Sequence, residues 1–441
     1  MLRFACFCLL LAAVTPVWSQ VEPSASGGGF DLDDQHMMTP PPVSGDAYPV
    51  IVGSEQRANY LAAGLVFTGS YVDNLMVSNI PIADETYSFQ PTISFDRHSS
   101  RQGESLHYSP GFELYQNTSQ LNGISQTGSA GYRFHMSPYA VLTLGETFQQ
   151  NYNLYNQGNP FVAGGISGSS GSPTTVLIAP FQNELTNSSD AGIEYQYGKN
   201  AMIGGSGTYS HVQYSNISTS LGLENSNTSD ASAFYSRRLD RAQYAGLVYQ
   251  FAKDVTHPID TYTVTSSVLG FYTIYFTRSF SLSVLGGPER YSSWAPNISR
   301  KDAWTPAVQG SFGWQGLRSS ISAGYSHVVS GAGGLSGSYK TTMVSVNSRV
   351  LLARTWSLGG NVGYTNFDTV NSIQAAQFGT GGRTISGGVG LSHRITEKIN
   401  AQAGYQHFHQ RYAGIPAASE FPDSNRAFVA ISYQFSRPLG R

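Results

Sequence analysis

Histidines are the side chains of this chain best suited to acid–base chemistry or metal binding. His407 and His409 are two residues apart, so they share one face of an extended strand. His211, His327 and His393 lie in other segments. Imidazoles can act as general bases or ligate a metal, but a metal at His407 and His409 would need further ligands from other strands. The simpler interpretation is that these histidines have ordinary polar or interfacial roles.

Known catalytic sequence motifs do not occur in the chain. We find no Gly-x-Ser-x-Gly, His-Glu-x-x-His, Gly-x-Gly-x-x-Gly or phosphate-loop sequence. The two cysteines, Cys6 and Cys8, fall within the first nineteen residues. We therefore predict that the protein is not an enzyme, and we assign it no catalytic residue, no cofactor and no metal.

The N-terminal segment has the pattern of a secretory signal peptide. Met-Leu-Arg is followed by an apolar stretch from Phe4 to about Val14 and by a cleavage sequence that ends at Ser19. Residues 20–57 are rich in Pro, Gly, Ser and Asp, which predicts a flexible periplasmic leader. The alternative is that this segment forms a small plug inside the rest of the protein. Removal of residues 1–19 would leave no thiol for a disulfide or a zinc site.

The elements that position the remaining chemistry are strands of alternating polarity. Near the C-terminus Ala427, Val429, Ile431, Tyr433 and Phe435 point one way, and the residues between them point the other way. The pattern recurs from about residue 59 to 435 and gives about eighteen strands, with sixteen as the alternative. Only 12% of the residues are charged, about half the usual share in soluble domains.

Connection lengths alternate along the chain. Short turns follow the even-numbered strands, and longer segments rich in Gly, Ser, Asn and Pro follow the odd-numbered ones. No run of eighteen apolar residues predicts a transmembrane helix. We therefore predict an all-β, antiparallel, up-and-down transmembrane barrel over residues 58–441, with a short C-terminal tail, periplasmic turns, external loops and both termini in the periplasm.

Charged and amide side chains mark the face that we expect to line the lumen. Arginine or lysine at the lipid midplane costs about 2–4 kcal/mol, so charges within strands belong inside a barrel. The predicted pore-lining residues are Glu113, Arg133, Glu194, Asn361, Asn400, Gln402 and Gln406. Two strands fit less well, around Glu146 and around residues 204–207, and for these we expect a bulge or a different register.

The third external connection, residues 154–182, is the longest and contains no Asp, Glu, Lys or Arg. A glycine-rich tether there leads to an apolar piece that could dock on the inner wall, which predicts a constriction for neutral polar solutes. The residues assigned to it are Tyr152, Tyr155, Asn156, Gln157, Phe161 and Phe181. A surface loop with interfacial tyrosines is the alternative.

Several features together resemble those of Gram-negative outer-membrane β-barrel proteins of the porin type. They are the signal peptide, the absence of later cysteines, the alternating strands, the turn parity and the aromatic last strand. The segment Gly69-Ser-Tyr-Val-Asp-Asn74 looks like a Tyr-x-Asp-Asn element found in outer-membrane barrels, some of which are associated with exopolysaccharide systems. One departure is that Phe435 is followed by six further residues, whereas such chains usually end on an aromatic residue.

This resemblance implies a channel in the bacterial outer membrane for passive diffusion of small polar solutes. The expected partners are outer-membrane lipid, the barrel-assembly machinery and the solutes, and a homo-oligomer is compatible with the pattern. A formal net charge of −2 gives no support for nucleic-acid binding. The alternatives are a plugged structural or exopolysaccharide-associated barrel and, less favoured, a barrel enzyme.

Overall fold

The computed structural model describes residues 59–75, 81–99, 101–151, 184–214, 224–257, 260–277, 279–296, 298–331, 338–370, 381–413 and 423–438. The predicted signal peptide and leader lie outside these residues. The described residues form one 3-10 turn, η1 (Ser119–Leu121), and eighteen strands. The strands are β1 (Tyr60–Val72), β2 (Asp84–His98), β3 (Gln102–Tyr115), β4 (Gly123–Ser137), β5 (Ala140–Asn151), β6 (Glu184–Gly198), β7 (Ala201–Tyr214), β8 (Asn225–Arg238), β9 (Gln243–His257), β10 (Thr261–Thr277), β11 (Phe280–Ala295), β12 (Ile298–Gln315), β13 (Ser319–Gly331), β14 (Ser338–Leu351), β15 (Trp356–Thr369), β16 (Gly381–Arg394), β17 (Ile399–Ala413) and β18 (Asp423–Pro438).

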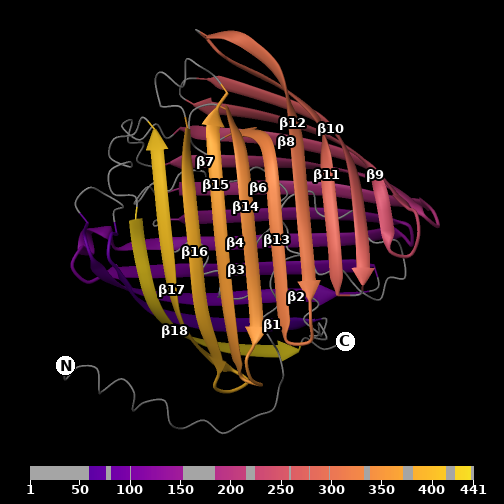
Figure 1. Ribbon diagram of the computed structural model, residues 1–441. Helices are drawn as coiled ribbons and strands as arrows, with labels where there is room; N and C mark the ends of the chain where they lie inside the picture. Colours follow the sequence, from indigo (N-terminus) through magenta and orange to yellow (C-terminus); the bar gives the residue numbers. More distant parts are fainter. Residues whose placement is uncertain are drawn as a thin grey trace, which may run out of the picture.

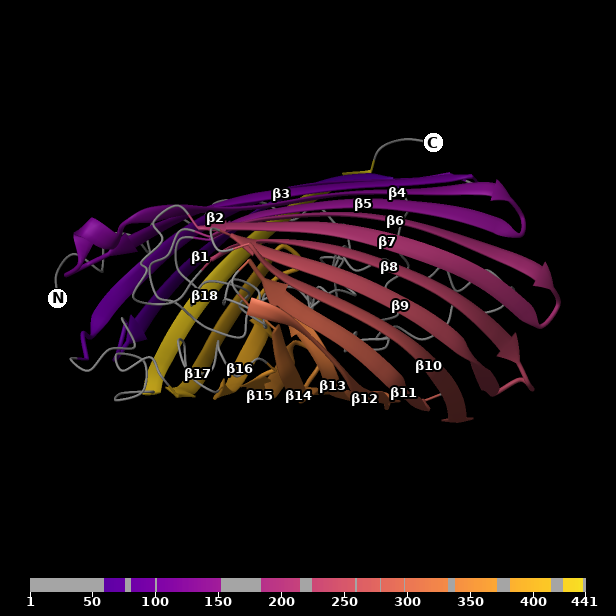
Figure 2. The same cartoon turned by 90° about the horizontal axis from the view of Figure 1, so that it is seen from above.

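The strands form one closed antiparallel sheet. Each strand pairs with its neighbours in sequence, and β1 also pairs with β18 from Tyr60 opposite Pro438 to Val72 opposite Arg426. In Figure 1 the strands β13 to β18 cross those behind them, as tilted strands of a barrel do. Figure 2 shows the sheet curving round until β18 lies beside β1. The predicted eighteen-stranded antiparallel barrel is confirmed.

The two ends of the barrel differ in their connections. At the end that we call the turn rim, the connections are short, such as residues 138–139, 199–200 and 316–318. The odd-numbered strands end at the other end, the loop rim, as β5 does at Asn151 and β15 at Thr369. Tyr60 and Pro438 are paired at the turn rim, so both ends of the barrel sequence lie there. This follows from an even number of antiparallel strands.

One predicted external loop is mostly strand. The sequence indicates a connection over residues 292–302, but β11 continues to Ala295 and β12 begins at Ile298. Ser292 faces Asp302 in the ladder and donates a hydrogen bond to its carboxylate. Trp294 stacks on Tyr262 of β10 with the ring centroids 5.3 Å apart. These cross-strand contacts extend the hairpin through a stretch whose Ser, Asn and Pro content is typical of a loop.

The two faces of the wall differ in chemistry. In β1 the side chains of Leu61, Phe67 and Tyr71 are exposed on the outer face, and Ala62 and Val66 are buried on the inner face. The same parity runs through the ladder, because each directly paired residue shares its partner's face. Outer positions are mainly large and apolar, and many inner positions are small or hydroxylated. The inner face of β10, for example, carries Thr261, Thr263, Thr265 and Ser267, all buried.

The irregularities expected in the fifth and seventh strands are absent. The ladder is continuous from β4 through β8 at both places, and shifts occur only beside the tight turns. Glu146 lies on the outer face opposite Ser189 and accepts a 2.7 Å hydrogen bond from the Asn187 amide. A polar neighbour on the next strand therefore accommodates this carboxylate without a change of register.

The wall turns inward between β12 and β13. These strands pair only between residues 308–315 and 320–327, although β13 continues to Gly331. Beyond that point the Val329 N–H donates a 2.9 Å hydrogen bond to the carboxylate of Glu289, an inner-face residue of β11. Val329 also packs against Tyr291 and Val370. The end of β13 therefore lies on the luminal side of β11, and it narrows the barrel near the loop rim.

The connection between β3 and β4 is held by Asp84 at the loop rim. Its carboxylate accepts hydrogen bonds from the Asn117 backbone and amide and from the Thr118 backbone and hydroxyl. Burial raises the pKa of Asp84, but the Thr118 hydroxyl and the backbone N–H groups of Asn117, Thr118 and Glu85 outweigh it and hold the pKa below its usual value.

This depressed pKa predicts acid sensitivity of the β3–β4 connection. A carboxyl group with a lower pKa in the folded state stabilises the fold above its unfolded-state pKa and loses that contribution as the pH falls through the folded-state value. We expect the protection of the Asn117 and Thr118 amides against hydrogen exchange, taken relative to the intrinsic rate at each pH, to fall below about pH 4, near the ordinary aspartate value. Asp84→Asn should exchange fast at neutral pH already, and an unchanged rate in that variant would contradict the assignment.

Candidate pore

The predicted pore-lining residues all occupy inner-face positions of the ladder. Glu113 is on β3, Arg133 on β4, Glu194 on β6, Asn361 on β15, and Asn400, Gln402 and Gln406 on β17. Glu113 is buried and the other six are half-buried. Their contact with a passing solute stays a prediction. The loop residues Tyr152, Tyr155, Asn156, Gln157, Phe161 and Phe181 lie outside the described residues.

One inner-face cluster joins strands that are far apart in sequence. The Tyr115 hydroxyl donates a 3.1 Å hydrogen bond to the carboxylate of Glu113 on the same strand. The buried guanidinium of Arg426 on β18 interacts electrostatically with both side chains, across β1 and β2. Between them the Ser70 and Thr86 hydroxyls are 2.5 Å apart. Sequence reasoning identified Glu113 and missed Arg426, although its position in the alternation of the last strand marks it as inward.

A second group of inner-face charges is acidic. Asp190 and Asp230 occupy one row of the ladder, separated by Thr208, and Asp254 lies on the next strand. The Thr228 hydroxyl donates a hydrogen bond to Asp254. Sequence reasoning found only Glu194 in this part of the wall. The alternation again contains the signal, because each of these aspartates falls on the polar parity of its strand. This side of the lumen therefore presents carboxylates and hydroxyls.

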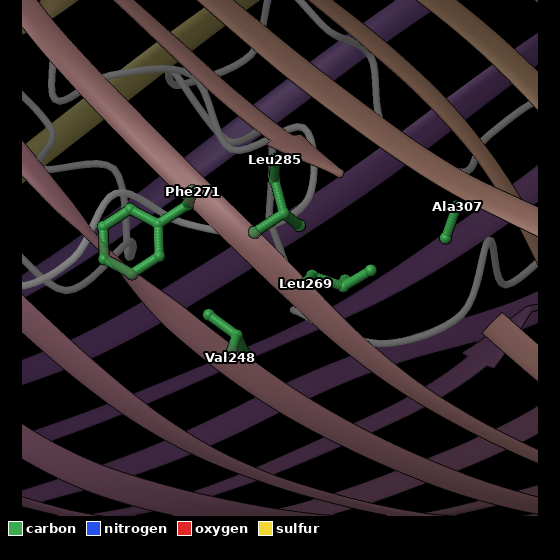
Figure 3. Close-up of a cluster of buried hydrophobic side chains, with 5 residues drawn as sticks. All are labelled: Val248, Leu269, Phe271, Leu285 and Ala307. Atoms are coloured by element: carbon green, nitrogen blue, oxygen red, sulfur yellow. The ribbon is translucent and has the colours of Figure 1, made fainter. Parts of the chain in front are cut away.

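Three inner phenylalanines pack along the wall instead of standing across the lumen. Each is paired with a glycine on the next strand, and a β-carbon on that glycine would clash with the ring. The pairs are Phe234 with Gly204, Phe271 with Gly246, and Phe428 with Gly404, with ring atoms 2.4–2.6 Å from the β-carbon position. Phe271 belongs to the buried cluster of Val248, Leu269, Leu285 and Ala307 in Figure 3. The glycines thus provide space beside the backbone for large rings.

The histidines do not form one site. His407 and His409 share the outer face of β17, as predicted, where their Nδ1 atoms lie 2.9 Å from Asn425 Oδ1 and 2.7 Å from Asp423 Oδ1. His211 is on β7, His327 contacts Thr342 on β14, and His393 stacks on Trp356. Within the described residues, no group of three His, Cys, Asp or Glu side chains could hold a metal ion.

The Tyr-Val-Asp-Asn element closes the barrel. The carboxylate of Asp73 accepts hydrogen bonds from the backbone and amide nitrogens of Asn425, at 2.7 and 2.6 Å. The Asn74 amide donates a 2.9 Å hydrogen bond to the carbonyl oxygen of Asp423. Asn425 Oδ1 also accepts a hydrogen bond from the Tyr405 hydroxyl. These contacts connect β1, β18 and β17 at the loop rim, so the element serves the wall itself.

Comparison with known proteins gives likeness in structure only. No family profile and no curated protein matches the sequence. Among solved structures, the chain is similar to OpdK of Pseudomonas aeruginosa with vanillate, at 10% identity and a TM-score of 0.43, over 86% of this chain and 99% of that one. It is also similar to OccK2 (OpdF) of Pseudomonas aeruginosa, at 9% identity and a TM-score of 0.45, over 86% and 98%. The third, OccAB2 of Acinetobacter baumannii, gives 10% identity and a TM-score of 0.44, over 85% and 98%.

Among the described residues no helix is long and apolar enough to cross a membrane.

Proposed function

We propose that this chain is a channel of the bacterial outer membrane through which small polar solutes diffuse passively. The observation that carries the proposal is the division of the closed wall into an apolar outer face and an inner face rich in hydroxyl, amide and carboxylate groups. A barrel with lipid outside and water inside requires this division. The turn rim then faces the periplasm together with both chain termini. Lipid and the barrel-assembly machinery are the partners that insertion requires.

The size of the barrel supports an open lumen. Barrels of eight strands are filled by their own side chains, whereas sixteen to eighteen strands leave an aqueous channel. The inner phenylalanines lie along the wall over glycines, so they leave the centre clear of their rings. The half-buried amide of Gln406 on the inner face of β17 offers a donor and an acceptor to neutral solutes such as sugars.

We further propose two constrictions near the loop rim. One is the inward end of β13, which the Glu289 carboxylate anchors through the Val329 N–H. The other is the third external loop, whose uncharged sequence would select by size and hydrogen bonding more than by charge. If the lumen carries no ionic current, the alternative is a plugged barrel with a structural or exopolysaccharide-associated role. The Tyr-Val-Asp-Asn element does not favour that alternative, because its polar groups bind within the wall.

Planar-bilayer conductance of the refolded chain lacking residues 1–19 tests the proposal. We expect stable, stepwise currents, because a water-filled lumen conducts ions. Deletion of residues 164–181 should enlarge each step if the third loop narrows the lumen. Heat-modifiable migration in detergent gels, measured on both proteins, verifies that each has folded as a barrel.

The outcomes separate the alternatives. Currents of equal size in both proteins would leave the channel in place and reject the loop constriction. Folded barrels that insert but carry no current, with or without the loop, would reject the channel and favour a plugged barrel. A boiled and an unboiled sample that migrate alike would count against the membrane barrel itself.

A further inference from the structure

A polar row crosses five strands on the outer face near the loop rim. It consists of His327, Thr342, Asn366, Arg383 and Arg411, each directly opposite the next in the ladder from β13 to β17. In the outer row one step closer to the turn rim, β13 to β16 carry the aromatic or aliphatic residues Tyr325, Val344, Tyr364 and Ile385, and β17 carries His409. Aromatic residues mark the interface between lipid chains and headgroups in such barrels. The polar row therefore lies at headgroup height.

Within this row two arginines face each other. Arg383 and Arg411 are directly paired between β16 and β17, and both side chains are exposed. In the described part of the chain neither guanidinium has a hydrogen bond or an ion pair. Like charges directly opposite each other destabilise a ladder, and paired positions have Cβ atoms only about 4.5–5.5 Å apart.

Among the described residues, two carboxylates lie two ladder positions from this pair, and both already have other partners. Asp368 of β15 accepts a 3.3 Å hydrogen bond from the Asn366 amide and lies opposite Lys340. Asp423 of β18 contacts His409 at 2.7 Å. Neither lies within ion-pair distance of Arg383 or Arg411. The two guanidiniums therefore need a negative charge that the described wall does not supply.

We propose that Arg383 and Arg411 together bind the phosphate group of a lipid headgroup in the membrane leaflet around the loop rim. Guanidinium groups bind phosphate oxygens through paired, charge-assisted hydrogen bonds, and an anion between them removes their mutual repulsion. The acyl chains of the same lipid would lie on the row of Tyr325, Val344, Tyr364 and Ile385. This site rests on the membrane insertion in the proposed function, but it does not depend on an open pore.

The test is a competition between two lipids that differ only in phosphate. The folded chain in detergent receives equal amounts of dioleoyl phosphatidic acid and dioleoylglycerol, and native mass spectrometry measures the lipid retained. We expect the wild type to retain mainly phosphatidic acid. Arg383→Gln with Arg411→Gln should lower that occupancy about tenfold, the effect of one charged hydrogen bond or more. The double lysine variant should give an intermediate value, because lysine keeps the charge without the paired donors.

A control for the loss of two exposed charges uses Arg97 on β2 and Arg237 on β8, which lie on the outer face at the turn rim and do not face each other. Their double glutamine variant should retain phosphatidic acid like the wild type. Equal retention by the Arg383 and Arg411 variant would overturn the proposal, and so would an equal loss in the control. Displacement of the lipid by inorganic phosphate at the same concentration would indicate a free-anion site instead.

Bilayer conductance distinguishes this proposal from that of the channel. The Arg383→Gln and Arg411→Gln variant should conduct like the wild type, because its substitutions lie on the outer face. A wild type that shows no current but prefers phosphatidic acid would retain the lipid site and reject the pore. A wild type that conducts but shows no preference for phosphatidic acid would support the pore and reject the lipid site.

Discussion

Replacing Val362 with arginine is expected to keep most of the protein from reaching the folded, membrane-inserted state. Val362 lies near the middle of β15 on the outer face, with 57% of its surface exposed. In a bilayer that surface contacts lipid chains, where an arginine costs about 2–4 kcal/mol at the midplane. Folding into lipid vesicles, followed by heat-modifiable migration, should show a large fall in the folded fraction.

The neighbouring residue provides a matched control. Asn361 occupies the inner face of the same strand, and its Oδ1 atom has no hydrogen-bond partner within the described structure. Asn361→Arg should therefore fold like the wild type and change only the current through the barrel. Equal folding of the two arginine variants would mean that the faces do not separate lipid from water, and the membrane assignment would then be lost.

The sequence was sufficient to predict the strands and their faces because both depend on local rules. Alternation at a period of two assigns each side chain to a face, and the turn residues divide the chain into hairpins. Every pair of hydrogen-bonded strands is therefore consecutive in sequence, apart from β1 and β18, which close the barrel. The same parity places Glu113 and Asn361 on the inner face, and it would have placed Arg426 there as well.

Features that depend on distant contacts could not be predicted from the sequence. Nothing near Val329 indicates that β13 leaves β12 and bonds to Glu289, forty residues earlier. Loop-like composition between β11 and β12 concealed a hairpin that Tyr262 stabilises from a third strand. Arg383 and Arg411 likewise face each other only because of the register between β16 and β17. The residues of the turn between these strands do not reveal that register directly.

The closing seam is the one place in the barrel wall where no hairpin sets the register. β1 and β18 are separated by nearly the whole barrel sequence, so their alignment depends on the wall itself. Asp73 binds both nitrogens of Asn425, 352 residues away, and Asn74 binds the backbone of Asp423. A slip by one residue would exchange the faces of a strand. We infer that these contacts help to select the register.

Asp73→Ala is expected to lower the free energy of unfolding by about 2–4 kcal/mol, because it removes two hydrogen bonds to a charged group and leaves the Asn425 amide without that partner. Unfolding in urea from lipid vesicles measures the loss. Asn425→Ala should cost a similar amount, and the double variant should cost much less than the sum, since neighbouring residues that share one interaction are not additive. Glu397→Ala, in an exposed turn at the opposite rim, should change little. Strictly additive losses for Asp73 and Asn425 would show that the two residues act independently, and no loss in either variant would show that the backbone ladder alone holds the seam.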